Sequence, residues 1–315
     1  MPSSTSAGTT SADVPRAAGA PVPLDVALYV VATPIGNLED IGRRAARILR
    51  SVSLIAAEDT RSSRPLLQSL GATARCVALH AHNEAEAADG LVRRIVHGEA
   101  VALITDAGTP GISDPGARLV DAAHRAGVRV IPIPGASAAS ALVSAAGLPE
   151  GRFVFDGFLP ARPRQRRERI ASLVALRRPF LVFEAPHRIE ATAADLAAAL
   201  PADRLVTVGR ELTKQFEQIV RLPVAGLSGW LAEEPNRRRG EFALLVFADA
   251  AADAVADKAA EQAGRAQVSE AGRLALVALT AELPPRQAAR LAARISGDDA
   301  DALYREAVAL RGNSA

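Results

Sequence analysis

A loop rich in glycine, proline and aspartate is the segment of this sequence best suited to bind a ligand. Residues 106–116 read Asp-Ala-Gly-Thr-Pro-Gly-Ile-Ser-Asp-Pro-Gly, with three glycines, two prolines and two aspartates. This composition argues against a regular helix or strand. The loop follows an apolar run at 100–105, and shaped loops at strand ends commonly carry binding residues. We therefore predict a ligand site here.

An acidic pair follows another apolar run. Glu58 and Asp59 come directly after residues 53–57 and precede Thr60 and Arg61. Carboxylates at the carboxyl end of a strand can accept hydrogen bonds from a substrate hydroxyl. Asp59 or Thr60 could equally cap the next helix, because short oxygen-bearing side chains accept hydrogen bonds from its first N–H groups. Both interpretations stay open.

Two other turns follow apolar runs. Residues 33–37 (Thr-Pro-Ile-Gly-Asn) are as consistent with a plain turn as with a ligand-binding one, although proline and glycine let backbone approach a ligand closely. Residues 132–139 lead into a helix, and the N–H groups at a helix start can receive a ligand. Neither a G-x-G-x-x-G nor a Walker sequence occurs, which disfavours a nicotinamide Rossmann site and a P-loop phosphate site.

Metal chemistry and disulfides are not expected. His80 and His82 lie two residues apart with no third ligand nearby, so hydrogen bonding at a cleft rim is the better interpretation. Cys76 is the single cysteine, which excludes a disulfide framework and a multi-cysteine zinc site and fits a reducing cytoplasm.

Arginines form two clusters and one stripe. Residues 162–169 contain five arginines, and 236–241 read Asn-Arg-Arg-Arg-Gly-Glu. Solvated surface is the usual meaning of such runs, but two clusters in a chain of net charge +2 favour an anionic partner. Arg286, Arg290 and Arg294 recur every four residues and form a basic stripe on one predicted helix, a weaker sign of nucleic-acid binding.

The elements that position these segments alternate between strand and helix. Expected strands are 27–33, 53–57, 75–79, 100–105 and 128–132, and expected helices are 40–51, 61–70, 84–97, 115–126 and 136–146. Asp40 and Asp114 are expected helix caps, with Pro115 at a first helical position. Apolar strands alternating with helices predict a parallel sheet covered on both faces.

A second block contains strands at 152–156, 180–184, 204–210, 216–221 and 241–248, and helices at 164–175, 186–200 and 224–233. Two of these strands follow each other without a helix, which predicts an antiparallel pair and a mixed sheet. Three short helices are expected at 269–281, 284–295 and 298–310. The expected organisation is a disordered tail (1–26), an N-terminal α/β domain (27–148), a second α/β domain (149–248), a linker (249–267) and a helical domain (268–315).

Neither a signal peptide nor a membrane span is expected. The first 24 residues lack the apolar run of a signal peptide and are typical of a disordered tail. The uncharged stretch 130–149 is interrupted by Pro132, Pro134 and Gly135, so it predicts a strand, a turn and a helix of small residues.

Taken in order, these segments resemble the tetrapyrrole methylase superfamily, and within it the branch that modifies ribosomal RNA. The resemblance runs from residue 28 to about residue 310. It is carried by 28–38, 56–61, 80–84, 106–116, 145–149 (Ala-Ala-Gly-Leu-Pro), 157–160 (Gly-Phe-Leu-Pro), 210–214 (Arg-Glu-Leu-Thr-Lys), 236–241 and, in the helical tail, 281–284 (Ala-Glu-Leu-Pro).

The resemblance implies a cytoplasmic homodimer of two-domain α/β subunits with a helical C-terminal domain, binding S-adenosylmethionine between the domains. The implied reaction is 2′-O-methylation of a cytidine in the decoding centre of 16S rRNA within the small ribosomal subunit. The implied donor-binding residues are Pro34, Gly36, Asp106, Gly108, Thr109, Pro110, Gly135, Ser137, Ala138, Phe183 and Arg210. The arginines expected to hold RNA phosphates are Arg164, Arg166, Arg167, Arg237, Arg238, Arg239, Arg286 and Arg290.

A general base would assist attack by the ribose hydroxyl. Glu58, Asp59 or Glu84 is the expected base, because each is placed at the predicted cleft edge, while Asp106 could instead bind the donor. Two alternatives remain. One is a precorrin or porphyrin C-methyltransferase, and the other is an RNA-binding ribosome-assembly factor without catalysis.

Overall fold

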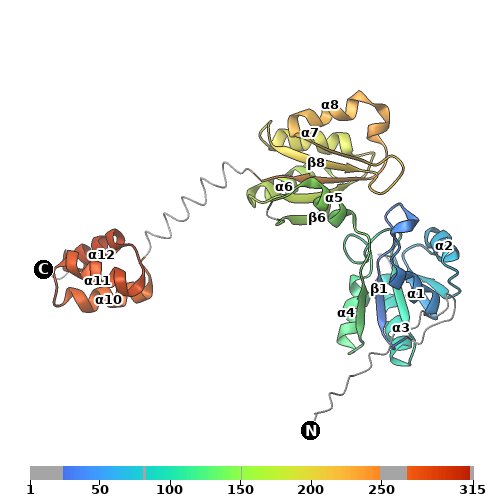
Figure 1. The fold of residues 1–315 in the computed structure, drawn as a ribbon, viewed down its shortest axis with the longest axis horizontal. Helices are drawn as coiled ribbons and strands as arrows, with labels where there is room; N and C mark the ends of the chain where they lie inside the picture. Colours follow the sequence, from blue (N-terminus) through green and yellow to red (C-terminus); the bar gives the residue numbers. More distant parts are fainter. Residues whose placement is uncertain (1–23, 81–82, 150, 249–267, 313–315) are drawn as a thin grey trace, which may run out of the picture. The chain divides into compact units, whose positions relative to one another are not determined.

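The computed structural model describes residues 24–80, 83–149, 151–248 and 268–312 of the chain (Figure 1). The predicted linker lies outside the described residues, as does the predicted tail except for its last three residues. The described residues divide into two compact units. Residues up to Ala175 together with Pro179–Phe247 form the first, and the C-terminal helices form the core of the second.

The first sheet is entirely parallel, as predicted. Its strands are β1 (Leu28–Val31), β2 (Leu54–Ala57), β3 (Arg75–Ala78), β4 (Val101–Ile104) and β5 (Val130–Ile133), in the order β3-β2-β4-β1-β5. Because alternate residues of a strand face opposite sides, Tyr29 and Val31 join one core and Leu28 joins the other. Both faces are therefore buried.

Helices cover each face of this sheet. Helices α1 (Arg43–Ser51) and α2 (Thr60–Ser69) supply Ala45, Ile48, Leu49 and Leu67 to one core. Helices α3 (Glu84–Val96) and α4 (Ala117–Arg125) supply Leu91, Ile95 and Leu119, among others, to the other core. All the predicted helices up to α4 are present, within a few residues of their expected ends.

The expected caps at Asp40 and Asp114 are wrong. Asp40 lies in a short 3-10 helix, η1 (Leu38–Asp40), and α1 is preceded by Gly42. Gly116 precedes α4 with φ 131°. A side chain at this glycine would meet Leu103, since an added Cβ would lie 2.8 Å from Leu103 Cδ2. The left-handed backbone at Gly116 separates Asp114 from the helix, so Asp114 is free to face elsewhere.

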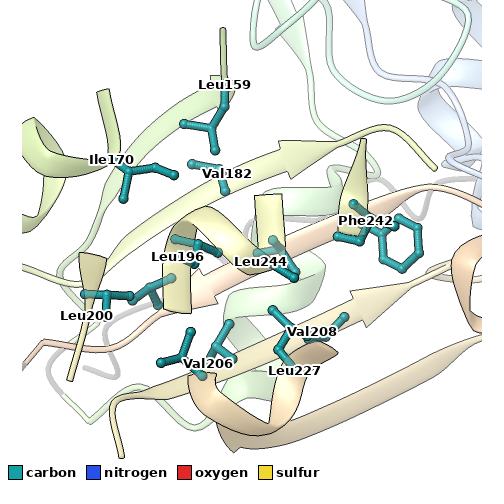
Figure 2. Packing of buried hydrophobic residues seen from close by; sticks show 14 of the residues in the cluster. Leu159, Ile170, Val182, Leu196, Leu200, Val206, Val208, Leu227, Phe242 and Leu244 are labelled. Carbon is teal, nitrogen blue, oxygen red and sulfur yellow. The ribbon is translucent and has the colours of Figure 1, made fainter. Parts of the chain in front are cut away.

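The second sheet is mixed, as predicted. Its strands are β6 (Val154–Phe158), β7 (Phe180–Glu184), β8 (Leu205–Arg210), β9 (Gln218–Pro223) and β10 (Phe242–Val246), in the order β6-β7-β10-β8-β9. Only β6 and β7 are parallel, and β8 and β9 form the expected antiparallel pair. Helices α6 (Pro163–Ala175), α7 (Ile189–Ala199) and α8 (Val224–Glu233) pack on one face, over Val182, Val208 and Leu244 (Figure 2).

Helix α5 (Ala138–Ala146) covers the opposite face of the second sheet. It follows β5 in sequence and lies within residues 27–148, the expected N-terminal domain. Its buried residues Ala139, Leu142 and Ala146 nevertheless pack with Leu181 and Leu245 of the second sheet. Figure 1 shows α5 beside this sheet. The apolar periodicity of α5 predicted a buried face but not the sheet that buries it.

The second unit is a small bundle of three helices. Helices α10 (Glu270–Thr280), α11 (Pro285–Ser296) and α12 (Ala300–Gly312) enclose a core that includes Leu276, Ala288, Ala292 and Leu303. Ser269 caps α10 by accepting a hydrogen bond from the Gly272 N–H. Among the described residues, no helix is long and apolar enough to span a bilayer.

Candidate active site

Three loops meet at the carboxyl edge of the first sheet, where parallel sheets bind ligands. The loop after β1 and the loop after β4 pair through Thr33 and Gly108, whose N–H and C=O groups exchange hydrogen bonds of 2.9 and 3.1 Å. Thr109 then donates a hydrogen bond of 3.0 Å to the carbonyl of Ala136 in the loop after β5. Hydrogen bonds between the loops after β1, β4 and β5, which are adjacent strands, therefore hold these loops together as one surface.

Glycine permits the close approach of these loops. Gly108 has φ 85°, and a Cβ added there would lie 3.2 Å from Ile35 Cγ2. A Cβ on Gly135 would lie 2.9 Å from the Ala32 Cβ. A side chain at position 135 would therefore displace Ala32, and one at position 108 would be strained by the left-handed backbone and would press on Ile35.

A cavity of about 280 Å³ opens beside these loops and is also lined by the second sheet. Its lining from the first part is Ile35, Ala107, Gly108, Thr109, Ile112, Ser113, Asp114, Ser137 and Ala138. Its lining from the second part is Phe158, Phe183, Glu184, Ala185, Pro186, Gly209, Leu212, Glu241, Phe242 and Ala243. The wall is mostly apolar with a few polar groups, the usual character of a small-molecule site.

Five of the eleven expected donor-binding residues line the cavity, namely Gly108, Thr109, Ser137, Ala138 and Phe183. The other six, which are Pro34, Gly36, Asp106, Pro110, Gly135 and Arg210, are not among its lining residues, although neighbours such as Ile35, Ala107 and Gly209 are. The cavity thus lies at the expected loops, and the donor-binding roles of all eleven residues stay predictions.

Arg210 supports the structure beneath the site. Its buried guanidinium donates hydrogen bonds to the carbonyls of Asn236, Arg239 and Phe216, at 2.6 to 3.2 Å. These bonds join the end of β8 to the segment before β10. Arg210 thus positions the backbone near Gly209 and does not itself face the cavity.

Glu84, one of the three expected bases, is a structural residue. It is 6% exposed, and its Oε1 accepts hydrogen bonds from the backbone N–H groups of Gly116 and Arg118, at 2.9 and 2.7 Å. A carboxylate at the N-terminus of α4 also interacts favourably with the helix dipole. Because this oxygen is occupied and the side chain is buried, Glu84 is not placed to act as the base.

Asp59 caps α2, which was one of its two open interpretations. Its Oδ1 accepts a hydrogen bond of 2.8 Å from the Arg61 N–H, and its Oδ2 pairs with the Arg61 guanidinium at 3.0 Å. Hydrogen bonds from the Arg61 side chain and backbone lower the pKa of Asp59 below its ordinary value. A carboxylate stabilised in its charged form is a weaker proton acceptor.

Glu58 and Asp106 form a hydrogen-bonded link between β2 and β4, which are neighbours in the sheet. The Asp106 N–H donates to Glu58 Oε2 at 3.3 Å, and the Asp59 N–H donates to Asp106 Oδ1 at 3.1 Å. Partial burial raises the pKa of Glu58, and the nearby charges of Asp106 and Asp59 raise it further. Neither Glu58 nor Asp106 lines the cavity.

Asp114 belongs to the loop predicted to bind a ligand, and the expectation that it also caps α4 is wrong. It lines the cavity, in the glycine-rich loop between β4 and α4. Burial raises its pKa from 3.8 to about 6, and the charges of Glu58, Asp106 and Glu241 contribute. The positive φ of Gly111 and Gly116, at 78° and 131°, shapes the loop that presents it.

Lys214 connects the two halves of the site. Its Nζ pairs with Glu211 Oε1 at 2.9 Å and with Glu241 Oε2 at 3.0 Å. Its side chain lies over Gly36, where an added Cβ would be 2.3 Å from Lys214 Cγ. The loop after β1 packs closely against the loop after β8 at Gly36, and this close packing near the site requires glycine there.

The expected RNA-binding arginines differ widely in exposure. Arg166 is 4% exposed and pairs with Asp195 at 2.7 Å, so it cannot reach RNA in this structure. Arg237 pairs with Glu233 and Glu234 and lies over the Trp230 ring. Arg164, Arg167, Arg238, Arg239, Arg286 and Arg290 are exposed. Among the described residues, no cluster of His, Cys, Asp and Glu could hold a metal ion.

The sequence matches two known families. Residues 27–228 match the family described as Tetrapyrrole (Corrin/Porphyrin) Methylases. Residues 266–311 match the RsmI C-terminal HTH domain. Together these matches span both units of the structure.

Several similar proteins carry the name ribosomal RNA small subunit methyltransferase I. The protein of Xylella fastidiosa is 47% identical, over 88% of this chain and 97% of its own length. That of Pseudomonas aeruginosa is 46% identical over 91% and 98%, and that of Escherichia coli O157:H7 is 44% identical over 90% and 96%.

Solved structures share the fold at low identity. Diphthine synthase has a TM-score of 0.55 and 19% identity, over 70% of this chain and 89% of its own. The cobalamin biosynthetic enzyme cobalt precorrin-4 methyltransferase has a TM-score of 0.52 and 18% identity, over 70% and 95%. These values show a common architecture alone.

Proposed function

Because the chain belongs to the tetrapyrrole methylase family, and within it to the ribosomal RNA small subunit methyltransferase I proteins, we propose that it methylates the 2′-hydroxyl of a cytidine ribose in 16S rRNA. The proposed target is the decoding centre of the small ribosomal subunit. The observation that carries the proposal is the identity of 41–47% with these proteins, along nearly their whole length.

S-adenosylmethionine is the methyl donor, as the sequence resemblance implied. The cavity fits this molecule chemically. Phe158, Phe183 and Phe242 offer apolar surface to an adenosine, and carboxylates on the wall complement the positive charges of a sulfonium and an amino group. Ser137 and Ala138 begin α5, whose first N–H groups suit the donor's carboxylate.

When bound, the donor supplies an electrophilic methyl group whose sulfonium charge is neutralised as the methyl group leaves. The protein's own contribution is mainly positioning, which can be worth many orders of magnitude in rate. The paired loops at Thr33, Gly108 and Thr109 hold one wall rigid. The aromatic contact of Phe158 with Phe183, with ring centroids 5.7 Å apart, orders the opposite wall.

The exposed arginines suit an RNA substrate. Arg286, Arg290 and Arg294 lie at four-residue intervals on α11 and are exposed. Arg239 is exposed near the segment before β10. Guanidinium groups on a surface can pair with phosphates in two-point geometry. We also propose that the protein is a cytoplasmic homodimer and that it acts on assembled small subunits.

Transfer of labelled methyl from S-adenosylmethionine to unmodified small ribosomal subunits tests it, with nuclease mapping of the product. We expect a 2′-O-methylated cytidine in the decoding region of 16S rRNA. Label on a precorrin or porphyrin and none on the subunits would favour the C-methyltransferase alternative. Failure to bind the donor in calorimetry would favour a non-catalytic assembly factor.

A further inference from the structure

Three carboxylates line the cavity, and they differ in what surrounds them. Glu184, Glu241 and Asp114 come from the end of β7, the segment before β10 and the loop after β4. A group that removes a proton from a substrate must present an unoccupied oxygen to the substrate. The surroundings of each carboxylate therefore decide which one can do so.

Glu184 is fully engaged by its own domain. Its side chain is buried, and its Oε1 accepts a hydrogen bond of 2.8 Å from the Ala185 N–H and pairs with Arg188 at 2.9 Å. Its Oε2 accepts a hydrogen bond of 2.6 Å from the Thr192 hydroxyl. This network shapes the loop at 185–188 and leaves Glu184 no oxygen for a substrate.

Glu241 forms an ion pair with a lysine that it shares with Glu211. Its Oε2 pairs with Lys214 Nζ at 3.0 Å, and its backbone N–H donates to Glu211 Oε1 at 2.9 Å. Lys214 Nζ thus occupies one carboxylate oxygen of Glu241, and the backbone bond fixes the segment before β10 against the loop after β8. Glu241 is thus better suited to hold the loop after β8 than to accept a proton.

Asp114 has a different environment. No Lys, Arg or His of the described residues forms an ion pair with it, whereas Glu58 (after β2), Asp106 (after β4) and Glu241 (before β10) place negative charge around it. Partial burial and like charges both favour the neutral acid, and they outweigh the Thr105 hydroxyl, which favours the carboxylate. A carboxylate in such surroundings holds a proton more strongly than one in water, which is what a proton acceptor requires.

We propose that Asp114 is the group that accepts the proton of the ribose hydroxyl during methyl transfer. The O–H bond breaks and its proton moves to a carboxylate oxygen of Asp114, while the new oxygen–carbon bond forms. The electron pair of the broken carbon–sulfur bond stays on sulfur, so the sulfonium becomes a neutral thioether. The charge balances, because one cation and one carboxylate become two neutral groups. This inference rests on the proposed function.

Asp114→Asn is the decisive variant, because the amide keeps the size of the side chain and cannot accept the proton. The measurement is single-turnover methylation of unmodified small subunits at saturating donor. A general base contributes about 10²–10⁴-fold, and we expect a loss of that size. The matched control is Asp121→Asn, on the neighbouring helix α4, where the exposed Asp121 pairs with Arg125.

The pH dependence separates a proton acceptor from a donor-binding residue. In the parent protein, the single-turnover rate should rise about tenfold per pH unit below pH 6 and level off above it, because only the deprotonated form of Asp114 reacts. The variant should lose this inflection. Calorimetry should show donor binding weakened by no more than a few-fold, because the carboxylates of Glu184 and Glu241 remain on the cavity wall. A variant that keeps the parent rate at saturating donor, or the same inflection, would overturn the inference.

A measurement without substrate checks the environment of Asp114 and the folding of the variant. A carboxyl group whose pKa is higher in the folded than in the unfolded protein stabilises the fold at pH values below its unfolded pKa. This contribution is lost as the pH rises through the folded pKa. Stability of the parent should therefore fall between pH 4 and 6 relative to Asp114→Asn, measured by urea unfolding. If the parent itself fails to methylate small subunits, the proposed function fails. If only the variant behaves unexpectedly, the assignment of Asp114 fails.

Discussion

The arginines packed around the second sheet and those on helix α11 look alike in sequence and differ in their surroundings. In the first group, Arg166 is buried against Asp195, and Arg237 is held by two glutamates and a tryptophan ring. On α11, Arg286, Arg290 and Arg294 are all exposed, and no ion pair within the described residues engages them. The same residue type thus stabilises the fold at Arg166 and Arg237 and is available to a partner on α11.

The difference arises from where each arginine falls on its helix. Arg166, Ile170 and Leu173 are the buried residues of α6, at a spacing of four and three, so Arg166 lies on the helix face that packs. The buried residues of α11 are Ala288, Ala289 and Ala292, which leaves the arginine stripe on another face. A count of arginines in a segment cannot distinguish these cases, but their phase relative to the apolar residues can.

The largest effect that we expect from this comparison is on the free energy of unfolding. Arg166→Ala should destabilise the protein by about 3 kcal/mol, because the nearly buried Asp195 loses its close partner and keeps only Arg167, at 3.8 Å. Urea unfolding measures the change. The matched control is Arg164→Ala on the same helix, where an exposed pair with Glu168 is worth only about 0.3–0.5 kcal/mol. Equal losses in the two variants would contradict a structural role specific to Arg166.

The next effect is on RNA binding through α11. Replacing Arg286, Arg290 and Arg294 together with alanine should weaken binding to decoding-region 16S rRNA and lower the salt-dependence slope by up to about 2–3, at roughly 0.7–0.9 per lost phosphate contact. Binding measured at several salt concentrations gives the slope. Arg273→Ala on α10 is the control, because Arg273 already pairs with Glu306. An unchanged slope in the triple variant would remove α11 from the RNA-binding surface.

We expect combined replacement of residues 237–239 with alanine to weaken RNA binding. The smallest effect is the difference in salt-dependence slope between single variants within this segment. Arg239→Ala should lower the salt slope by about 0.7–0.9, because its side chain is exposed and its hydrogen bonds, to Arg210 and Asn236, are made by the backbone. Arg237→Ala should leave the slope unchanged, since that guanidinium is occupied by Glu233 and Glu234. The same titration measures both variants, and an equal change in the two would show that Arg237 releases its partners to bind RNA.

Local sequence was enough to predict most of the secondary structure. The strands are short apolar runs between turn residues, and the helices have apolar residues at helical spacing, so hydrophobic periodicity and turn chemistry located nearly all of them. The parallel first sheet and the antiparallel β8–β9 pair also followed from the order of elements. These properties depend on residues close together in the chain.

The roles of individual side chains depended on partners distant in sequence. Glu84 caps α4 from 32 residues away, Asp106 bonds to residues 47 and 48 positions earlier, and α5 packs on a sheet built from later strands. The sequence around Asp114 is typical of a helix cap, but the left-handed backbone at Gly116 separates Asp114 from the helix. Amino-acid pattern predicts which backbone conformation a segment adopts, because that choice is local. Which oxygen is occupied, and which carboxylate faces the cavity, is set by packing between elements, because only folding brings those charges together.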